Sequence, residues 1–168
     1  MAEQVTELLR SYLSPELVVF IISMLPVLEL RGGLIAASLL GIPWQTATVI
    51  SLLGNALPIP FILLFLKQVL LFLKKLRPFQ GLVLWIENRA QAKCAEVMEK
   101  HPHRIQLALF LFVAIPLPGT GAWTGALIAV FLGIKMRKSV GPICLGILGA
   151  AVIMLVITYF LPFLAGLK

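Results

Sequence analysis

The chain has 168 residues, of which 60% are hydrophobic and 12% are charged, with a mean hydropathy of +1.03 and a formal net charge of +7. A soluble domain of this size rarely has such a composition, so we expect a single transmembrane domain over residues 1–168. The two cysteines, Cys94 and Cys144, lie far apart in different settings, which argues against a disulfide or a cysteine metal site.

The amino-terminal part predicts one interfacial helix and one short membrane helix. Charged residues interrupt 1–14, so this segment is not expected to be a cleavable signal but a helix at the membrane surface. Residues 17–28 carry no charge and end at Glu29 and Arg31. Twelve residues are too few to cross a bilayer as a helix and suit the first arm of a re-entrant hairpin.

The next uncharged run, 32–66, has 35 residues and is long enough for two elements. Its first part, GLIAASLLGI (33–42), is expected to be the return arm of the hairpin, and a turn follows at 41–43. Residues 46–66 then predict a full crossing, which Pro58 and Pro60 would kink.

Residues 74–104 form the only extended polar stretch, with seven basic and three acidic residues. Apolar residues recur there at near-helical spacing, so we expect an amphipathic interfacial helix over 76–104 that joins two halves of the protein. A membrane setting favours anionic lipid over nucleic acid as the partner of these charges. His101 and His103 have no carboxylates at useful spacing, so no metal and no cofactor are expected.

Residues 105–134 contain no charge, and the string IPLPGTGAWTG (115–125) interrupts them. Thirty helical residues would span roughly 45 Å, well beyond a hydrocarbon core of about 30 Å. Prolines and glycines at the midpoint predict two short helices instead, which form a second re-entrant hairpin. A second crossing is expected at roughly 143–161, with Pro142 near its start.

The two halves resemble each other. GLIAASLLGI (33–42) and GALIAVFLGI (125–134) share five of ten residues at an offset of 92, and Gly54 and Gly146 have the same offset. We therefore predict an all-α integral membrane fold with a first repeat over about 14–75 and a second over about 105–167. Each repeat would contain one hairpin and one crossing, so the two would be inverted, with a substrate site near the midplane.

The distribution of lysine and arginine predicts the orientation. The basic linker 74–104 and the loop KMRK (135–138) hold most of these residues and should face the cytoplasm. The protein is then a multi-pass protein of the cell membrane, inner or plasma.

Glu29 and Arg31 are the most informative charges, because an ionisable group within the membrane is expensive unless it is paired or hydrated. If Arg31 is buried, Glu29 is its obvious counter-ion, and removing either alone should be worse than removing both. The return arms of the two hairpins are expected to begin around Gly32 and around Gly119–Gly125, and their first N–H groups would be free to bind an anion. Glu29 could take up a proton. The predicted substrate-binding residues are Glu29, Arg31, Gly32, Gly33, Pro116, Pro118, Gly119, Thr120, Gly121, Trp123 and Thr124.

The strings LPVLELRGG (25–33) and IPLPGTGAWTG (115–125) resemble the family of small multidrug export proteins. This family is similar to the DedA (VTT-domain) superfamily, whose paired re-entrant hairpins form an inverted repeat and whose members translocate lipids, including undecaprenyl phosphate. The resemblance implies transport and places Glu29 and Arg31 where those proteins have acidic and basic residues. It departs from DedA in one respect, because 105–134 lacks the arginine found near the second hairpin.

Three functions remain open from the sequence. The favoured one is translocation of a polyprenyl phosphate or a phospholipid, with Arg31 holding the phosphate and Glu29 coupling a proton. The second is export of small cationic drugs with Glu29 as the partner of the cation, and the third is a membrane assembly factor. The chain has no Asp, and Ser23, Ser38 and Ser51 have no base beside them, so no enzyme is expected. A homodimer is expected because one small copy has little surface to seal a pathway.

Overall fold

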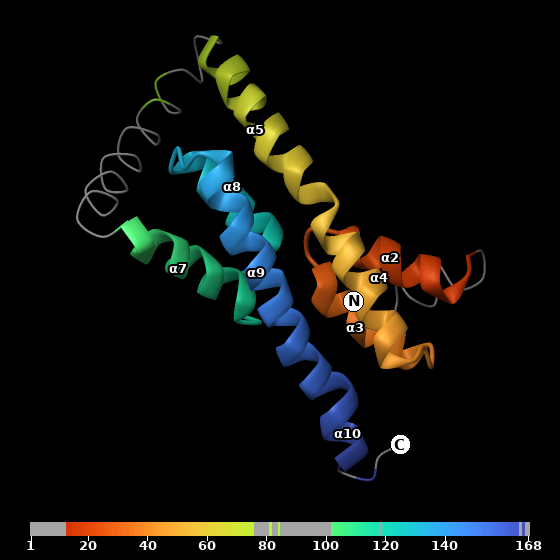
Figure 1. Cartoon of the computed structure of the whole chain (residues 1–168). Helices are drawn as coiled ribbons and strands as arrows, with labels where there is room; N and C mark the ends of the chain where they lie inside the picture. Colours follow the sequence, from red (N-terminus) through yellow and green to blue (C-terminus); the bar gives the residue numbers. More distant parts are fainter. Residues whose placement is uncertain are drawn as a thin grey trace.

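The computed structural model describes residues 13–75, 81, 84, 102–117, 119–164 and 166, and every regular element within them is a helix (Figure 1). The all-helical fold class is therefore confirmed. The predicted interfacial helix over 1–14 and the predicted linker helix over 76–104 lie almost wholly outside the described residues, as does Pro118.

The first half contains α2 (Pro15–Met24), α3 (Glu29–Leu39), α4 (Trp44–Ala56) and α5 (Pro58–Lys75). Helix α2 begins with Pro at its first position, and the Ser14 hydroxyl accepts a hydrogen bond from the backbone N–H of Leu17 at 3.4 Å. Helix α3 ends at Leu39 and a glycine turn follows: Gly41 has a φ of 71°, which suits glycine, and the Ile42 N–H donates back to the Ala37 carbonyl at 2.9 Å.

The second half contains α7 (Pro102–Ala114), α8 (Ala122–Phe131), α9 (Met136–Leu155), the π-helix η1 (Val156–Phe160) and α10 (Leu161–Leu164). Its second helix ends as α3 does: Gly133 has a φ of 67°, and the Ile134 N–H donates to the Ala129 carbonyl at 2.9 Å. Both halves thus have two short helices followed by one long helical stretch, and both close the second short helix with the same glycine turn.

Within the described part of the chain, two helical stretches are long and apolar enough to cross a membrane, Trp44–Leu66 and Met136–Leu164. They contain the crossings predicted at 46–66 and 143–161. Less than half of either stretch is buried, so these helices present apolar side chains outward, as expected for contact with lipid.

The prolines in these stretches lie differently from the expectation. Leu57 separates α4 from α5 just before Pro58, yet it keeps helical dihedrals and its N–H donates to the Leu53 carbonyl at 3.1 Å. Pro142 was expected near the start of the second crossing, but it lies inside α9, because the helix already begins at Met136.

Glycines let the short helices approach the long ones closely, and they do so alike in both halves. A Cβ on Gly54 would lie 2.6 Å from the Phe20 carbonyl oxygen, and one on Gly146 would lie 3.0 Å from the Phe110 carbonyl oxygen. Gly54 and Gly146 are 92 residues apart, and Phe20 and Phe110 are 90 apart. The shared packing shows that the two sets of glycines serve the same contact between helices.

The halves also pack on each other. Helix α8 lies against α5, and α3 lies against α9. The Tyr159 hydroxyl donates to the Ile42 carbonyl at 3.0 Å and joins the end of the second half to the turn of the first. The second short helix of each half, α3 or α8, therefore packs against the long helical stretch of the other half. These contacts bring together the segment between α2 and α3 and the segment between α7 and α8, which we call the first and the second break.

We predict that Gly146→Ala destabilises the protein, whereas Gly141→Ala in the same helix does not. The new Cβ at 146 would meet Val113 at 2.6 Å, and overpacking of this kind costs about 1–3 kcal/mol. At 141 nothing lies within 4 Å of the added Cβ, and alanine favours the helix over glycine. Thermal unfolding of the purified protein in detergent measures both. Equal melting temperatures for the two variants would contradict the packing described.

Candidate functional site

Glu29 caps the start of helix α8 from the other half of the chain. Its carboxylate accepts hydrogen bonds from the backbone N–H groups of Ala122 at 3.2 Å and Trp123 at 2.9 Å. These are among the N–H groups that have no partner within the helix, and they lie at the positive end of the helix dipole. Glu29 is 4% exposed, so its negative charge is buried against this helix end.

The local backbone shows what this contact requires. Glu29 has a φ of 50°, which is uncommon for any residue except glycine, Asn and Asp. Gly121, the residue before α8, has a φ of 141°, and a Cβ there would overlap the Glu29 carboxylate. Glycine at 121 is therefore needed both for the backbone conformation and for the approach of the carboxylate.

Arg31 caps the end of helix α7 in the opposite sense. Its Nη1 donates to the Leu117 carbonyl at 2.8 Å, and its Nη2 donates to the Ile115 carbonyl at 3.1 Å and lies 3.4 Å from that of Val113. These carbonyls belong to the last turn of α7 and the segment that follows, where the helix dipole is negative. The guanidinium thus adds a charged donor to backbone oxygens of which two, those of Ile115 and Leu117, also accept from nearby N–H groups and lie within reach of the Thr120 hydroxyl.

Thr120 organises the segment between α7 and α8. Its Oγ1 accepts from Arg31 Nη2 at 3.1 Å and from the Leu117 N–H at 3.2 Å. The same hydroxyl lies 2.8 Å from the carbonyl oxygens of Ile115 and Leu117 and can donate to either. The second break is therefore a defined structure built on Arg31 and Thr120.

The sequence made Glu29 the counter-ion of Arg31 if Arg31 were buried; in the structure Arg31 is half-buried, and the hydrogen bonds of both residues go to the second half. The two residues are close on one helix, but each charge faces a helix end of the opposite sign. The N–H groups of α8 were expected to bind an anion, yet Glu29 already occupies two of them. In α3 the Gly32 N–H donates to the Leu28 carbonyl at 2.8 Å.

A pocket of about 350 Å³ lies where the two breaks meet. Six of the predicted residues line it, namely Glu29, Arg31, Gly32, Pro116, Gly119 and Thr120. Five apolar residues that the sequence did not single out complete it, namely Val27, Leu28, Ile35, Leu117 and Met154. Ile35 follows Arg31 by one helical turn and could have been inferred from that spacing, whereas Met154 comes from α9 and has no such signal.

The remaining predicted residues have other surroundings. Gly33 packs against the Ser23 side chain, and Trp123 contributes its backbone N–H to Glu29, while its buried indole Nε1 has no partner among the described residues. Thr124 is half-buried on α8. No group of three or more potential metal ligands occurs in the part of the chain that the structure describes.

We predict that Glu29→Gln and Arg31→Gln each lower the melting temperature and that the double variant is the least stable. Glu29→Gln weakens the hydrogen bonds to two N–H groups at the start of α8, and Arg31→Gln removes charged hydrogen bonds to carbonyls near the end of α7, at a cost of about 1.5–3 kcal/mol per bond. Thermal unfolding in detergent measures this, with Glu16→Gln and Arg104→Gln, both exposed, as charge-matched controls. A double variant more stable than either single one would show that the two charges act mainly as a pair.

Much of this region of the chain matches a known protein family. Residues 29–153, well over half of the chain, match the model of a family described as "Putative small multi-drug export protein". The match begins at Glu29 and runs from α3 through most of α9, so it includes both charges and eight of the eleven residues that line the pocket. No curated protein and no solved structure gives a significant match.

Proposed function

The chain belongs to the small multi-drug export protein family, and on that premise we propose that it exports small amphipathic cations across a membrane. The pocket between the two breaks would be the binding site. The observation that carries this proposal is the Glu29 carboxylate in the wall of a largely apolar pocket. Each of its oxygens accepts one N–H bond, which leaves acceptor capacity for a cationic group.

The membrane arrangement in this proposal has two re-entrant hairpins, α2–α3 and α7–α8, and two crossings, Trp44–Leu66 and Met136–Leu164. The hairpin helices have 10 to 13 residues and are roughly 15–20 Å long, too short for a core of about 30 Å. With one crossing per half, the halves are inverted, and the pocket lies near the midplane. The common order of elements and the shared glycine packing support this arrangement.

The orientation in the proposal places KMRK (135–138) and the linker 74–104 in the cytoplasm of a cell membrane protein. We also propose a homodimer, because one chain of 168 residues has little surface with which to seal a pathway.

A proton is the proposed coupling ion. Protonation of Glu29 removes the negative charge that faces the start of α8, so it weakens the contact between the halves. Release of that contact would open the pocket, and rebinding of the carboxylate to the Ala122 and Trp123 N–H groups would close it. Substrate and proton would then compete for one carboxylate.

A second function has one observation in its favour. Arg31 lines the same pocket and is only half-buried, so its guanidinium could bind the phosphate of a polyprenyl phosphate or a phospholipid. This is the flippase activity that the likeness to DedA proteins implies. Against it, Arg31 already donates to three carbonyls and one hydroxyl, which a phosphate would have to displace.

Transport by the reconstituted protein separates these functions. In liposomes with an inward proton gradient, we expect efflux of a fluorescent cation such as ethidium, and we expect Glu29→Gln to abolish it. Arg31→Ala should leave cation efflux measurable but abolish any flipping of a fluorescent polyprenyl phosphate. Glu16→Gln is the control, because it removes an exposed acid that does not line the pocket.

Three outcomes would contradict the proposal. Flipping without cation efflux would favour the lipid function. Efflux that survives Glu29→Gln would exclude this carboxylate as the binding group. A folded wild-type protein that moves neither compound would favour a membrane assembly factor.

A further inference from the structure

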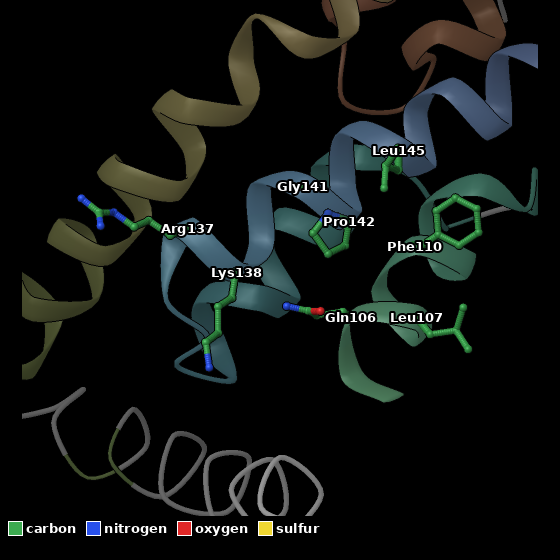
Figure 2. A pocket seen from close by; sticks show the side chains of 8 residues that line it. All are labelled: Gln106, Leu107, Phe110, Arg137, Lys138, Gly141, Pro142 and Leu145. Atoms are coloured by element: carbon green, nitrogen blue, oxygen red, sulfur yellow. The ribbon is translucent and has the colours of Figure 1, made fainter. Parts of the chain in front are cut away.

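A second and larger pocket lies between α7 and α9, away from the contact of the two breaks. It is an open groove of about 540 Å³, and it begins at KMRK (135–138), which was expected to be a loop but whose last three residues form the first turn of α9 (Figure 2). The residues that line it are Gln106, Leu107, Phe110, Arg137, Lys138, Gly141, Pro142 and Leu145. Its volume lies within the range of known ligand sites, and it shares no lining residue with the pocket at Glu29.

The groove is polar at one end and apolar along its length. Figure 2 shows Lys138 and Gln106 at the end nearer the start of α9, with Phe110 and Leu145 farther along. Arg137 extends to another side of α9 in the same view. None of the described residues that line the groove is acidic. This combination suits a molecule with an anionic head and an apolar tail.

The repeat shows that this chemistry belongs to the second half alone. At an offset of 92, Gln45 and Thr46 stand where Arg137 and Lys138 do, and at an offset of 90, Glu16 stands where Gln106 does. The equivalent positions in the first half therefore have one acid and no base. Val49 corresponds to Gly141, so the first half also has a side chain where the groove has none.

We propose that the groove between α7 and α9 binds one anionic phospholipid from the leaflet that KMRK (135–138) faces. The phosphate would contact Lys138 and Gln106, with Arg137 adding positive charge, and one acyl chain would run along Leu107, Phe110 and Leu145. Leu107 and Leu145 are 56% and 58% exposed, so an acyl chain would cover apolar surface that the protein leaves open.

Membrane electrostatics agree with this occupant. The cytoplasmic leaflet carries the anionic lipids, and lysines and arginines near it bind them favourably. In the proposed orientation KMRK (135–138), at the start of α9, lies on the cytoplasmic side. The groove would then lie at the leaflet where its ligand is concentrated. This site is independent of the transport proposal and would hold lipid whether or not the protein moves cations.

Native mass spectrometry of the intact protein in an uncharged detergent tests the headgroup. With added phosphatidylglycerol we expect one retained lipid per chain, and with phosphatidylcholine of the same acyl chains much less. Arg137→Gln with Lys138→Gln should weaken retention of phosphatidylglycerol by about fivefold for each lost charge. Arg104→Gln with Lys135→Gln is the control, because it removes the same charge from exposed residues outside the groove.

Gly141→Leu tests the groove itself. Nothing lies within 4 Å of a Cβ at this position, so the leucine would enter the groove without a clash and exclude the acyl chain. We expect loss of the retained lipid at an unchanged melting temperature. If this variant melts lower, Gly141→Val, which copies the residue of the first half, takes its place.

Two results would overturn the proposal. Equal loss in the charge control would mean that lipid binds through general attraction to positive charge. Retention that survives both substitutions at 141 would mean that lipid binds elsewhere.

Discussion

The fold depends on hydrogen bonds to two helix ends, the end of α7 and the start of α8, which lie next to each other in an apolar setting. Helix α7 ends and α8 begins within the same short segment, so unpaired carbonyls and unpaired N–H groups accumulate there. In a membrane, water is not at hand to satisfy them, and each group left alone costs several kcal/mol. Arg31 binds the carbonyls and Glu29 binds the N–H groups, and both side chains come from the first turn of α3. The first half thereby completes the fold of the second.

This arrangement explains why 105–134 contains no charge of its own. At the first break, nearby backbone supplies hydrogen-bond partners. The Glu29 N–H donates to the Leu25 carbonyl at 2.8 Å, and the Gly32 N–H donates to the Leu28 carbonyl at 2.8 Å. In the second break, 115–121, the local backbone and the Thr120 hydroxyl supply some of the partners, and Arg31 and Glu29 add charged ones from the first half.

Much of the architecture could be predicted from the sequence, because it depends on local properties. Uncharged runs set the long helices, the prolines and glycines around 116–121 set the second break, and the offset of 92 paired Gly54 with Gly146. Glu29 and Arg31 were identified as the important charges because charge within an apolar run is costly. Their partners could not be predicted, since those partners are backbone atoms about 90 residues away. The same limit applies to Met154, whose place in the pocket wall depends on how α9 crosses α3.

The same contacts that hold the halves together would also link substrate binding to opening in the proposed transport cycle. A cation that binds Glu29 competes with the start of α8, and an anion that binds Arg31 competes with the end of α7. Either ligand would bind better to a state in which its partner has left the helix end, and a ligand shifts an equilibrium only by such a difference in affinity. Since both helix ends flank the segment 115–121, release of either charge would loosen the same segment. In the proposed cycle, a pocket built from helix caps would therefore respond to ligand charge without any additional switch.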